Sequence, residues 1–335
     1  MGQLDKAEEA FAEAAMVSRA AGLAHGAVVA ALQQVNVQRL RGARRRALAT
    51  GWATLAWAAE NYELPSVARL LTVMADLLLD KNDVAAALPL AVDGLRAPRE
   101  FGNPAPLVLL ASLPLARLHL AEGDAAAAAV VLSEVRPLVQ HGPFAVLAPL
   151  VDAAEARVRL AVGDSAAALD WAIALDPTAL PDPLRFGVPA VEAMVVTPVR
   201  VLVAQSLATG DFALLQETER RVDAAWHLAE KQGIGWLRLR LHIAQSLIAE
   251  AGKDHDGALR SLAAAVAEAE PEGVIGPFLD EGAPMAALLA ALRTASRNHH
   301  WRTGGTLPAY LDALLAAFTG QKPPPPERLS ERLAS

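Results

Sequence analysis

Polar side chains recur at one phase of a repeating pattern, and they are the residues best suited to contact a ligand. The position six residues before successive turn signals is occupied by Asn36, Asp76, Arg117, Arg157, Ala204 and Ser246. Apolar residues alternate with this position, so it belongs to one face of a recurring helix. Amide, carboxylate, guanidinium and hydroxyl groups on one surface suit a peptide or a small polar ligand. The candidate groove residues are Asn36, Asp76, Arg117, Arg157 and Ser246. The alternative is that these positions form the solvent-exposed face of each helix, and the sequence does not decide between the two interpretations.

Histidine and carboxylate clusters elsewhere do not form a recognisable catalytic or metal-binding pattern. The adjacent pair His299-His300 points to different faces of any helix, and its polar, Gly-rich surroundings predict a solvated loop. Asp254-His255-Asp256 is predicted to form a turn and a helix cap. The sequence Gly252-Lys253 is followed by Asp254, so it lacks the Ser or Thr that completes a phosphate-binding P-loop.

Four carboxylates lie close together near the C-terminus, at Glu270, Glu272, Asp280 and Glu281. They are predicted to belong to a segment that closes the fold, because no pocket for acid–base catalysis is evident around them. We therefore expect no enzyme activity, no catalytic residues, no cofactor and no metal.

The composition restricts the class of protein further. The chain has 335 residues and no cysteine, which excludes disulfides and thiolate zinc sites and fits a reducing cytosol. The net charge of −7 argues against direct binding to nucleic acid, which needs cationic contacts to phosphate. Five arginines between Arg39 and Arg46 are predicted to form a solvated surface cluster, with an anionic partner as the alternative. The N-terminus does not resemble a signal peptide. Charges interrupt the most apolar region, Leu107–Leu132, so no membrane span is predicted and a cytoplasmic location is expected.

The groove positions depend on an internal repeat. Turn signals recur every 40 to 47 residues, at Gly2, Gly42, Asn82, Gly123, Gly163, Gly210 and Gly252. Glycine ends a helix readily, and Asp or Asn beside it can cap the next one. Five residues after the first five signals stands an alanine each time, at Ala7, Ala47, Ala87, Ala128 and Ala168, as close packing of paired helices requires.

This pattern predicts about seven helix–turn–helix units stacked into an all-α superhelix with a concave groove. The first helix of each pair is predicted at about 26–40, 65–79, 106–121, 144–161, 190–208 and 234–250. The second is predicted at about 4–20, 44–60, 84–96, 125–140, 165–175, 212–232 and 256–269. Residues 176–189 are expected to form the longest irregular stretch. The alternative architecture is a helical bundle without repeats.

Residues 268–290 carry a family resemblance. Their segment Glu270-Pro271-Glu272-Gly273 is followed by Phe278, Asp280, Glu281, Gly282, Pro284, Met285, Leu288 and Leu289. This pattern resembles the end of the tetratricopeptide (TPR)-like domain in large ATP-binding LuxR-type regulators, the MalT-like family. Val274 and Gly276 depart from the Tyr and Arg usual there. Residues 310–318 also resemble the family, and Leu329–Arg332 looks like the start of its helix-turn-helix domain.

The resemblance implies a TPR-like array over 1–267, closing helices of the same solenoid over 268–320, and a Pro-rich linker with a truncated helix-turn-helix start over 321–335. In the family an ATPase module and a DNA-binding domain flank the repeats; neither motif set is present, so a truncated or mis-framed product is expected. The implied function is sensing and interaction: an effector or protein partner in the groove, with self-association of the whole regulator as a further expectation. A stand-alone TPR scaffold that binds a protein segment is the main alternative, and an enzyme accessory domain is a third. Neither nucleic acid nor membrane is an expected partner of this fragment.

Overall fold

The computed structural model describes residues 2–59, 65–100, 102, 105–176, 183–297 and 307–320, and this part of the chain is helical without any strand. The N-terminal half contains α1 (Gln3–Ala20), α2 (Ala24–Leu40), α3 (Arg44–Trp57), α4 (Pro65–Asp80), α5 (Val84–Glu100), α6 (Ala105–Ala121), α7 (Ala125–Gln140), the 3-10 helix η2 (Gly142–Leu147), α8 (Ala148–Ala161) and α9 (Ser165–Ala174). The C-terminal half contains α10 (Pro183–Val191), the π-helical turn η3 (Glu192–Val196), α11 (Thr197–Thr209), α12 (Phe212–Gln232), α13 (Gly235–Ala251), α14 (His255–Ala269), the 3-10 helix η4 (Glu270–Glu272), α15 (Gly276–Leu279), α16 (Gly282–Arg297) and α17 (Leu307–Phe318). The predicted all-α, TPR-like superhelix is confirmed.

The predicted turns have the backbone geometry that ends one helix and starts the next. The residue between paired helices is left-handed at Gly42, Asn82, Gly123, Gly163 and Gly210, with φ between 60° and 82°. At the last turn the left-handed residue is Lys253, one position later than the predicted Gly252. The predicted cap is confirmed at Asp254, whose carboxylate accepts a hydrogen bond from the amide of Gly257. Four of the five repeated alanines, Ala47, Ala87, Ala128 and Ala168, are fully buried.

One local prediction needs correction. Residues 183–189 belong to helix α10 and are not irregular; the helix breaks at Gly187, where φ is 70°. Proline suits the first turn of a helix because its missing amide has no partner there, and Pro183 begins α10. Residues 177–182 of the same stretch lie outside the described residues, as do His299-His300 and the linker 321–335.

The segment Gly187–Thr209 is long and apolar enough to cross a membrane, which the prediction of no span did not anticipate. Within the fold, however, 67% of its apolar window is buried, as in a core helix. Val191, Val201 and Leu202 are among its residues with no exposed surface.

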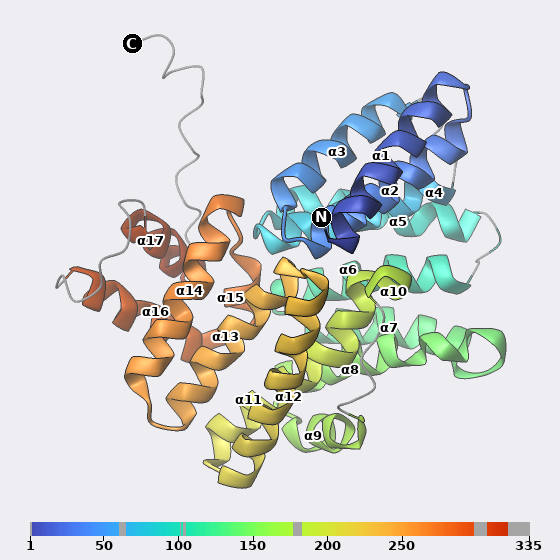
Figure 1. The fold of residues 1–335 in the computed structure, drawn as a ribbon. Coiled ribbons are helices and arrows are strands. Elements are labelled where there is room, and N and C mark those ends of the chain that lie inside the picture. Colours follow the sequence, from blue (N-terminus) through green and yellow to red (C-terminus); the bar gives the residue numbers. More distant parts are fainter. Residues whose placement is uncertain are drawn as a thin grey trace, which may run out of the picture.

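The superhelix returns on itself. Figure 1 shows the chain passing from the blue N-terminal helices through green and yellow to an orange and red C-terminal group, in which α13 contacts α2 and α15 contacts α4. A Cβ atom added at Gly235, the first residue of α13, would lie 2.3 Å from the carbonyl oxygen of Arg41. One hydrophobic cluster accordingly joins Leu4 and Leu40 to Trp236 and Phe278. The N-terminal and C-terminal repeats therefore share one core.

Candidate functional site

Helix α4 forms the centre of the candidate site. It is almost wholly buried, yet it carries Asp76 and Asp80 one turn apart on the same face. Asp76 is paired with Arg39 from α2 and with Arg117 from α6. Asp80 accepts from Arg44 Nε at 3.1 Å and from Arg117 Nη2 at 3.2 Å. Carboxylates on one helix therefore bind arginines from the repeats on both sides.

The segment around α15 adds a carboxylate from a distant part of the chain. Asp280 Oδ2 lies 3.0 Å from Arg240 Nη1, 3.3 Å from Arg157 Nη2 and 3.9 Å from Arg117 Nη2. The adjacent Glu281 pairs with Arg200 at 2.7 Å. Asp280 thus joins arginines from α6, α8 and α13, which are remote from one another in sequence.

Backbone contacts hold this segment against α4. The amide of Ile275 donates a hydrogen bond to the carbonyl of Asp80 at 2.8 Å. A Cβ atom added at Gly276 would lie 2.4 Å from the carbonyl oxygen of Leu79. The glycine that departs from the family pattern therefore permits a close approach of two backbones that no larger residue would allow.

A π-helical turn supplies the remaining carboxylate. Glu192 begins η3 and its Oε1 lies 2.9 Å from Arg157 Nη1, while its Oε2 lies 4.0 Å from Arg240 Nη2. A π-helical turn changes the direction of side chains along a helix and is frequent at functional sites. We use the name charge layer for these interacting residues: Arg39, Arg44, Asp76, Asp80, Arg117, Arg157, Glu192, Arg200, Arg240, Asp280 and Glu281.

The charge layer controls the ionisation of its own members. Burial raises the energy of the Asp280 carboxylate, but Arg157, Arg200 and Arg240 outweigh this effect and hold the pKa of that carboxyl well below its usual value. The pKa of Asp80 is likewise depressed, because Arg44 and Arg117 outweigh burial. These carboxyls are therefore ionised at neutral pH despite being buried.

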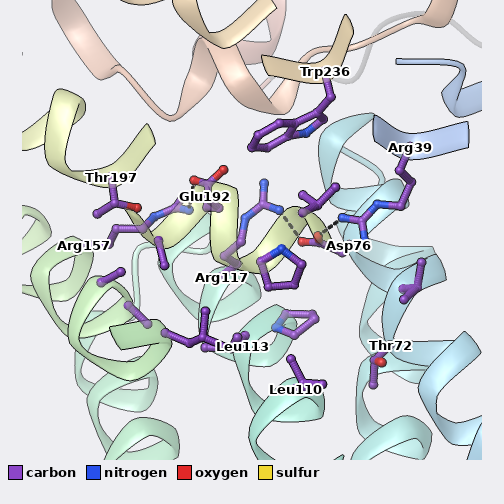
Figure 2. Close-up of a pocket in the computed structure, with 18 of the residues that line it drawn as sticks. Arg39, Thr72, Asp76, Leu110, Leu113, Arg117, Arg157, Glu192, Thr197 and Trp236 are labelled. Atoms are coloured by element: carbon purple, nitrogen blue, oxygen red, sulfur yellow. Dashed lines mark hydrogen bonds and ion pairs between the residues drawn. The ribbon is translucent and has the colours of Figure 1, made fainter. Parts of the chain in front are cut away.

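Two cavities are lined by members of the charge layer, and Arg117 and Arg157 line both. The Trp236 cavity has a volume of about 70 Å³ and is lined by Arg39, Arg69, Thr72, Val73, Asp76, Leu110, Leu113, Pro114, Arg117, Leu150, Ala153, Ala154, Arg157, Val188, Pro189, Glu192, Ala193, Thr197 and Trp236. The Asn82 cavity has a volume of about 380 Å³ and is lined by Leu79, Asn82, Arg117, Leu120, Ala121, Arg157, Leu160, Ala161, Arg200, Ala204, Gly276, Leu279, Asp280, Glu281 and Gly282. Figure 2 shows Trp236 on one side of Arg117 and Asp76, with Leu110 and Leu113 on the opposite side.

The structure brings three of the five candidate groove residues together. Asp76, Arg117 and Arg157 all line the Trp236 cavity. Asn36 lies apart, with its side-chain amide bonded to Gln33. Ser246 is fully buried and its hydroxyl donates to the carbonyl of Ile243. The three middle residues of this phase therefore reach the cavity, whereas the residues at its two ends, Asn36 and Ser246, do not.

Two expectations about charged clusters are wrong. Arg39 and Arg44, placed in a solvated surface cluster, are each only 2% exposed because they pair with buried aspartates of α4. The C-terminal carboxylates were expected to have no pocket, yet Asp280 and Glu281 line the Asn82 cavity. The expectation failed because the cavity wall comes from repeats that are distant in sequence.

The sequence contained partial signals for the residues that were missed. Helix α4 is apolar except for a few positions, and Arg69, Asp76 and Asp80 recur there at spacings that place them on one side of a helix. In α13, Arg240 is buried beside Trp236, with its guanidinium carbon 5.5 Å from the centre of the Trp236 ring. Arg238 instead pairs with Glu268 at the surface.

The chemistry available here is ionic recognition. In the part of the chain that the structure describes, no group of three or more His, Cys, Asp or Glu residues is placed to hold a metal ion. No match was found among curated protein sequences. A family model described as the MalT-like TPR region matches residues 1–295, which is most of the chain. With its paired helices and its left-handed turns, the chain belongs to the MalT-like TPR region family.

Proposed function

We propose that this chain is the signal-sensing and interaction region of a LuxR-type transcriptional regulator. An effector or partner bound on the concave side of the superhelix controls the position of the closing segment, residues 268–320. In this proposal residues 1–267 form the repeat array that receives the signal, and the protein acts in the cytoplasm without catalysing a reaction. Direct contact with DNA is not part of this region's role.

One observation carries the proposal. Arg117 and Arg157 line both cavities and also contact Asp280 of the closing segment. A molecule that binds in either cavity therefore touches the side chains that hold this segment in place. Such a ligand changes the equilibrium between docked and released states of the segment by its different affinity for each. Self-association of the full regulator would then follow from the surface that the segment covers or exposes.

A cavity-blocking variant tests the binding part of this proposal. Ala154 lines the Trp236 cavity, and the indole of Ala154→Trp fills it, whereas Ala129→Trp places the same indole on an exposed position of α7. We expect a thermal-shift screen of small polar metabolites and peptides to find a compound that raises the melting temperature of the parent and of Ala129→Trp. The same compound should not stabilise Ala154→Trp, or the milder Ala154→Leu if the tryptophan variant melts poorly.

Two outcomes would contradict the proposal. The first is a set of compounds that stabilise the cavity-blocked variants as strongly as the parent. The second is tight, sequence-selective binding of this chain to duplex DNA at physiological salt, which its net charge of −7 disfavours. Sequencing of the surrounding genomic DNA separates the regulator from the scaffold alternative: the regulator requires an ATP-binding module upstream and a helix-turn-helix downstream.

A further inference from the structure

Arg69 is a cation of the Trp236 cavity without a carboxylate partner among the described residues. Its Nη1 donates to the hydroxyl of Thr72 at 3.0 Å, and that hydroxyl in turn donates to the carbonyl of Arg69. Burial, followed by the nearby Arg39, lowers the pKa of Arg69 to about 10, although the charge of Asp76 opposes both, so the guanidinium remains charged at neutral pH. An unpaired cation in a partly desolvated position is unfavourable unless a ligand neutralises it.

The net charge of the residues around the cavity is also positive. The charge layer contains six arginines and five carboxylates, and Arg69 is a seventh cation beside it. The described residues therefore leave two positive charges in excess next to the cavity. An anion would complete this set, whereas a neutral ligand would leave it unbalanced.

Buried polar atoms without partners also line the Trp236 cavity. The hydroxyl of Thr197 has no exposed surface and no hydrogen-bond partner. The Nε of Arg39, a residue that is only 2% exposed, also has no partner. Buried polar groups are nearly always hydrogen-bonded, so the polar side of this cavity is incompletely satisfied. Neither atom has accessible surface, so direct pairing with an occupant falls to the guanidinium of Arg69.

Most of the cavity wall is nevertheless apolar. Leu110, Leu113, Leu150, Val188 and Ala193 line it together with Trp236. Figure 2 shows Leu110 and Leu113 on the side of the cavity away from Trp236. The volume of about 70 Å³ equals that of roughly five waters, since one water needs about 10–15 Å³. The occupant must therefore be small and combine an apolar body with an anionic group.

From these contacts we infer that the Trp236 cavity binds a small organic acid, with its carboxylate paired to Arg69 and its hydrocarbon body against the leucines of α6. The inference rests on the proposed function and specifies the chemical class of the effector. A guanidinium holds a carboxylate through two parallel hydrogen bonds, which gives both affinity and orientation. A sugar or another neutral ligand would leave Arg69 uncompensated.

The test uses propionate, butyrate and isobutyrate, each beside its neutral amide, with inorganic phosphate as an anion that lacks an apolar body. Calorimetry and thermal shift are measured on the whole chain. We expect at least one acid to bind, and its amide and phosphate to bind at least about tenfold more weakly, which corresponds to about 1.4 kcal/mol.

Substitutions at Arg69 assign the effect to this residue. We expect Arg69→Met to melt no lower than the parent without ligand, since it removes an uncompensated charge, and to lose the response to the acid. Arg69→Lys keeps the charge and should keep a weaker response. The matched control Arg96→Met removes a charge from a side chain that is 66% exposed and should change neither property.

Three results would overturn the inference: amides that bind as well as acids, an undiminished acid response in Arg69→Met, or no binding by any of the acids. Other results test the proposed sensing function independently of the ligand class. If a neutral metabolite stabilises the parent and not Ala154→Trp, the cavity is a sensing site for a different class of ligand. If nothing discriminates those two proteins, the sensing role itself is refuted.

Discussion

The carboxylate of Asp280 is predicted to be the main polar attachment of the closing segment. Asp280→Asn keeps the shape of the side chain and removes its charge. It leaves Arg240, whose side chain is 2% exposed, and Arg157, at 9%, without the carboxylate that lies 3.0 and 3.3 Å away. Arg157 keeps Glu192 at 2.9 Å and Arg240 keeps Asp80 at 3.7 Å, and the Asp280 side chain is 21% exposed. The expected loss is therefore that of a hydrogen bond to a charged group, about 1.5–3 kcal/mol.

A surface ion pair in the same part of the chain supplies the control. Asp312 and Arg293 lie 3.1 Å apart, but their side chains are 50% and 37% exposed. Exposed pairs contribute about 0–1 kcal/mol, because water and salt screen the charges. Asp312→Asn should therefore destabilise the protein by less than about 1 kcal/mol.

Urea unfolding followed by circular dichroism measures both variants, and urea is chosen because it does not screen charges. Hydrogen exchange gives a local measurement, since the amide of Ile275 donates to the carbonyl of Asp80 only while the segment is docked. We expect this amide to exchange faster in Asp280→Asn than in Asp312→Asn. Equal stability of the two variants, with unchanged exchange at Ile275, would refute the role assigned to the charge layer.

Three further predictions concern the same region. Gly276→Ala places a Cβ 2.4 Å from a backbone oxygen and should destabilise by about 1–3 kcal/mol, whereas Gly252→Ala, with its nearest such contact at 3.5 Å, should not; thermal melts compare the two. Phe278→Ala removes a fully buried ring and should lower the unfolding free energy by about 3–5 kcal/mol in urea titrations, and an effect below 1 kcal/mol would show that α15 is not packed as described. The aspartates of the charge layer have pKa values below those of the unfolded chain, because their arginine partners outweigh burial; their contribution is therefore complete above about pH 4 and is lost as the pH falls further, so the melting temperature should drop steeply below pH 4. Burial raises the pKa of Glu281, so this residue has the opposite effect on the pH dependence. A melting temperature that stays constant down to pH 3 would contradict the dominance of the aspartates.

The repeat architecture was predictable because it depends on local chemistry. Glycine or asparagine at a fixed spacing ends each helix, and a small residue five positions later permits close packing. The placement of Asp76, Arg117 and Arg157 beside one cavity follows from the same local chemistry, since one phase of a helix determines which side chains share a face.

The closure of the superhelix was not predictable from local signals. It depends on small rotations that accumulate from one repeat to the next, and no single residue encodes them. Without closure, nothing indicates that Asp280 meets Arg157, which is 123 positions away in the sequence. The burial of Arg240 has the same origin, because its partners Asp80 and Asp280 come from distant parts of the chain.

The contact between Gly42 and Gly235 limits the gain or loss of repeat units in this protein. A Cβ atom on Gly42 would lie 3.3 Å from the backbone of Gly235, so the two ends of the array meet with almost no free space. Open solenoids can gain or lose a unit by recombination, because each repeat touches only its neighbours. In this protein an added or deleted unit would separate these glycines and move Asp280 away from its arginines. The contacts of α13 with α2 and of α15 with α4 therefore tie this fold to its present number of repeats.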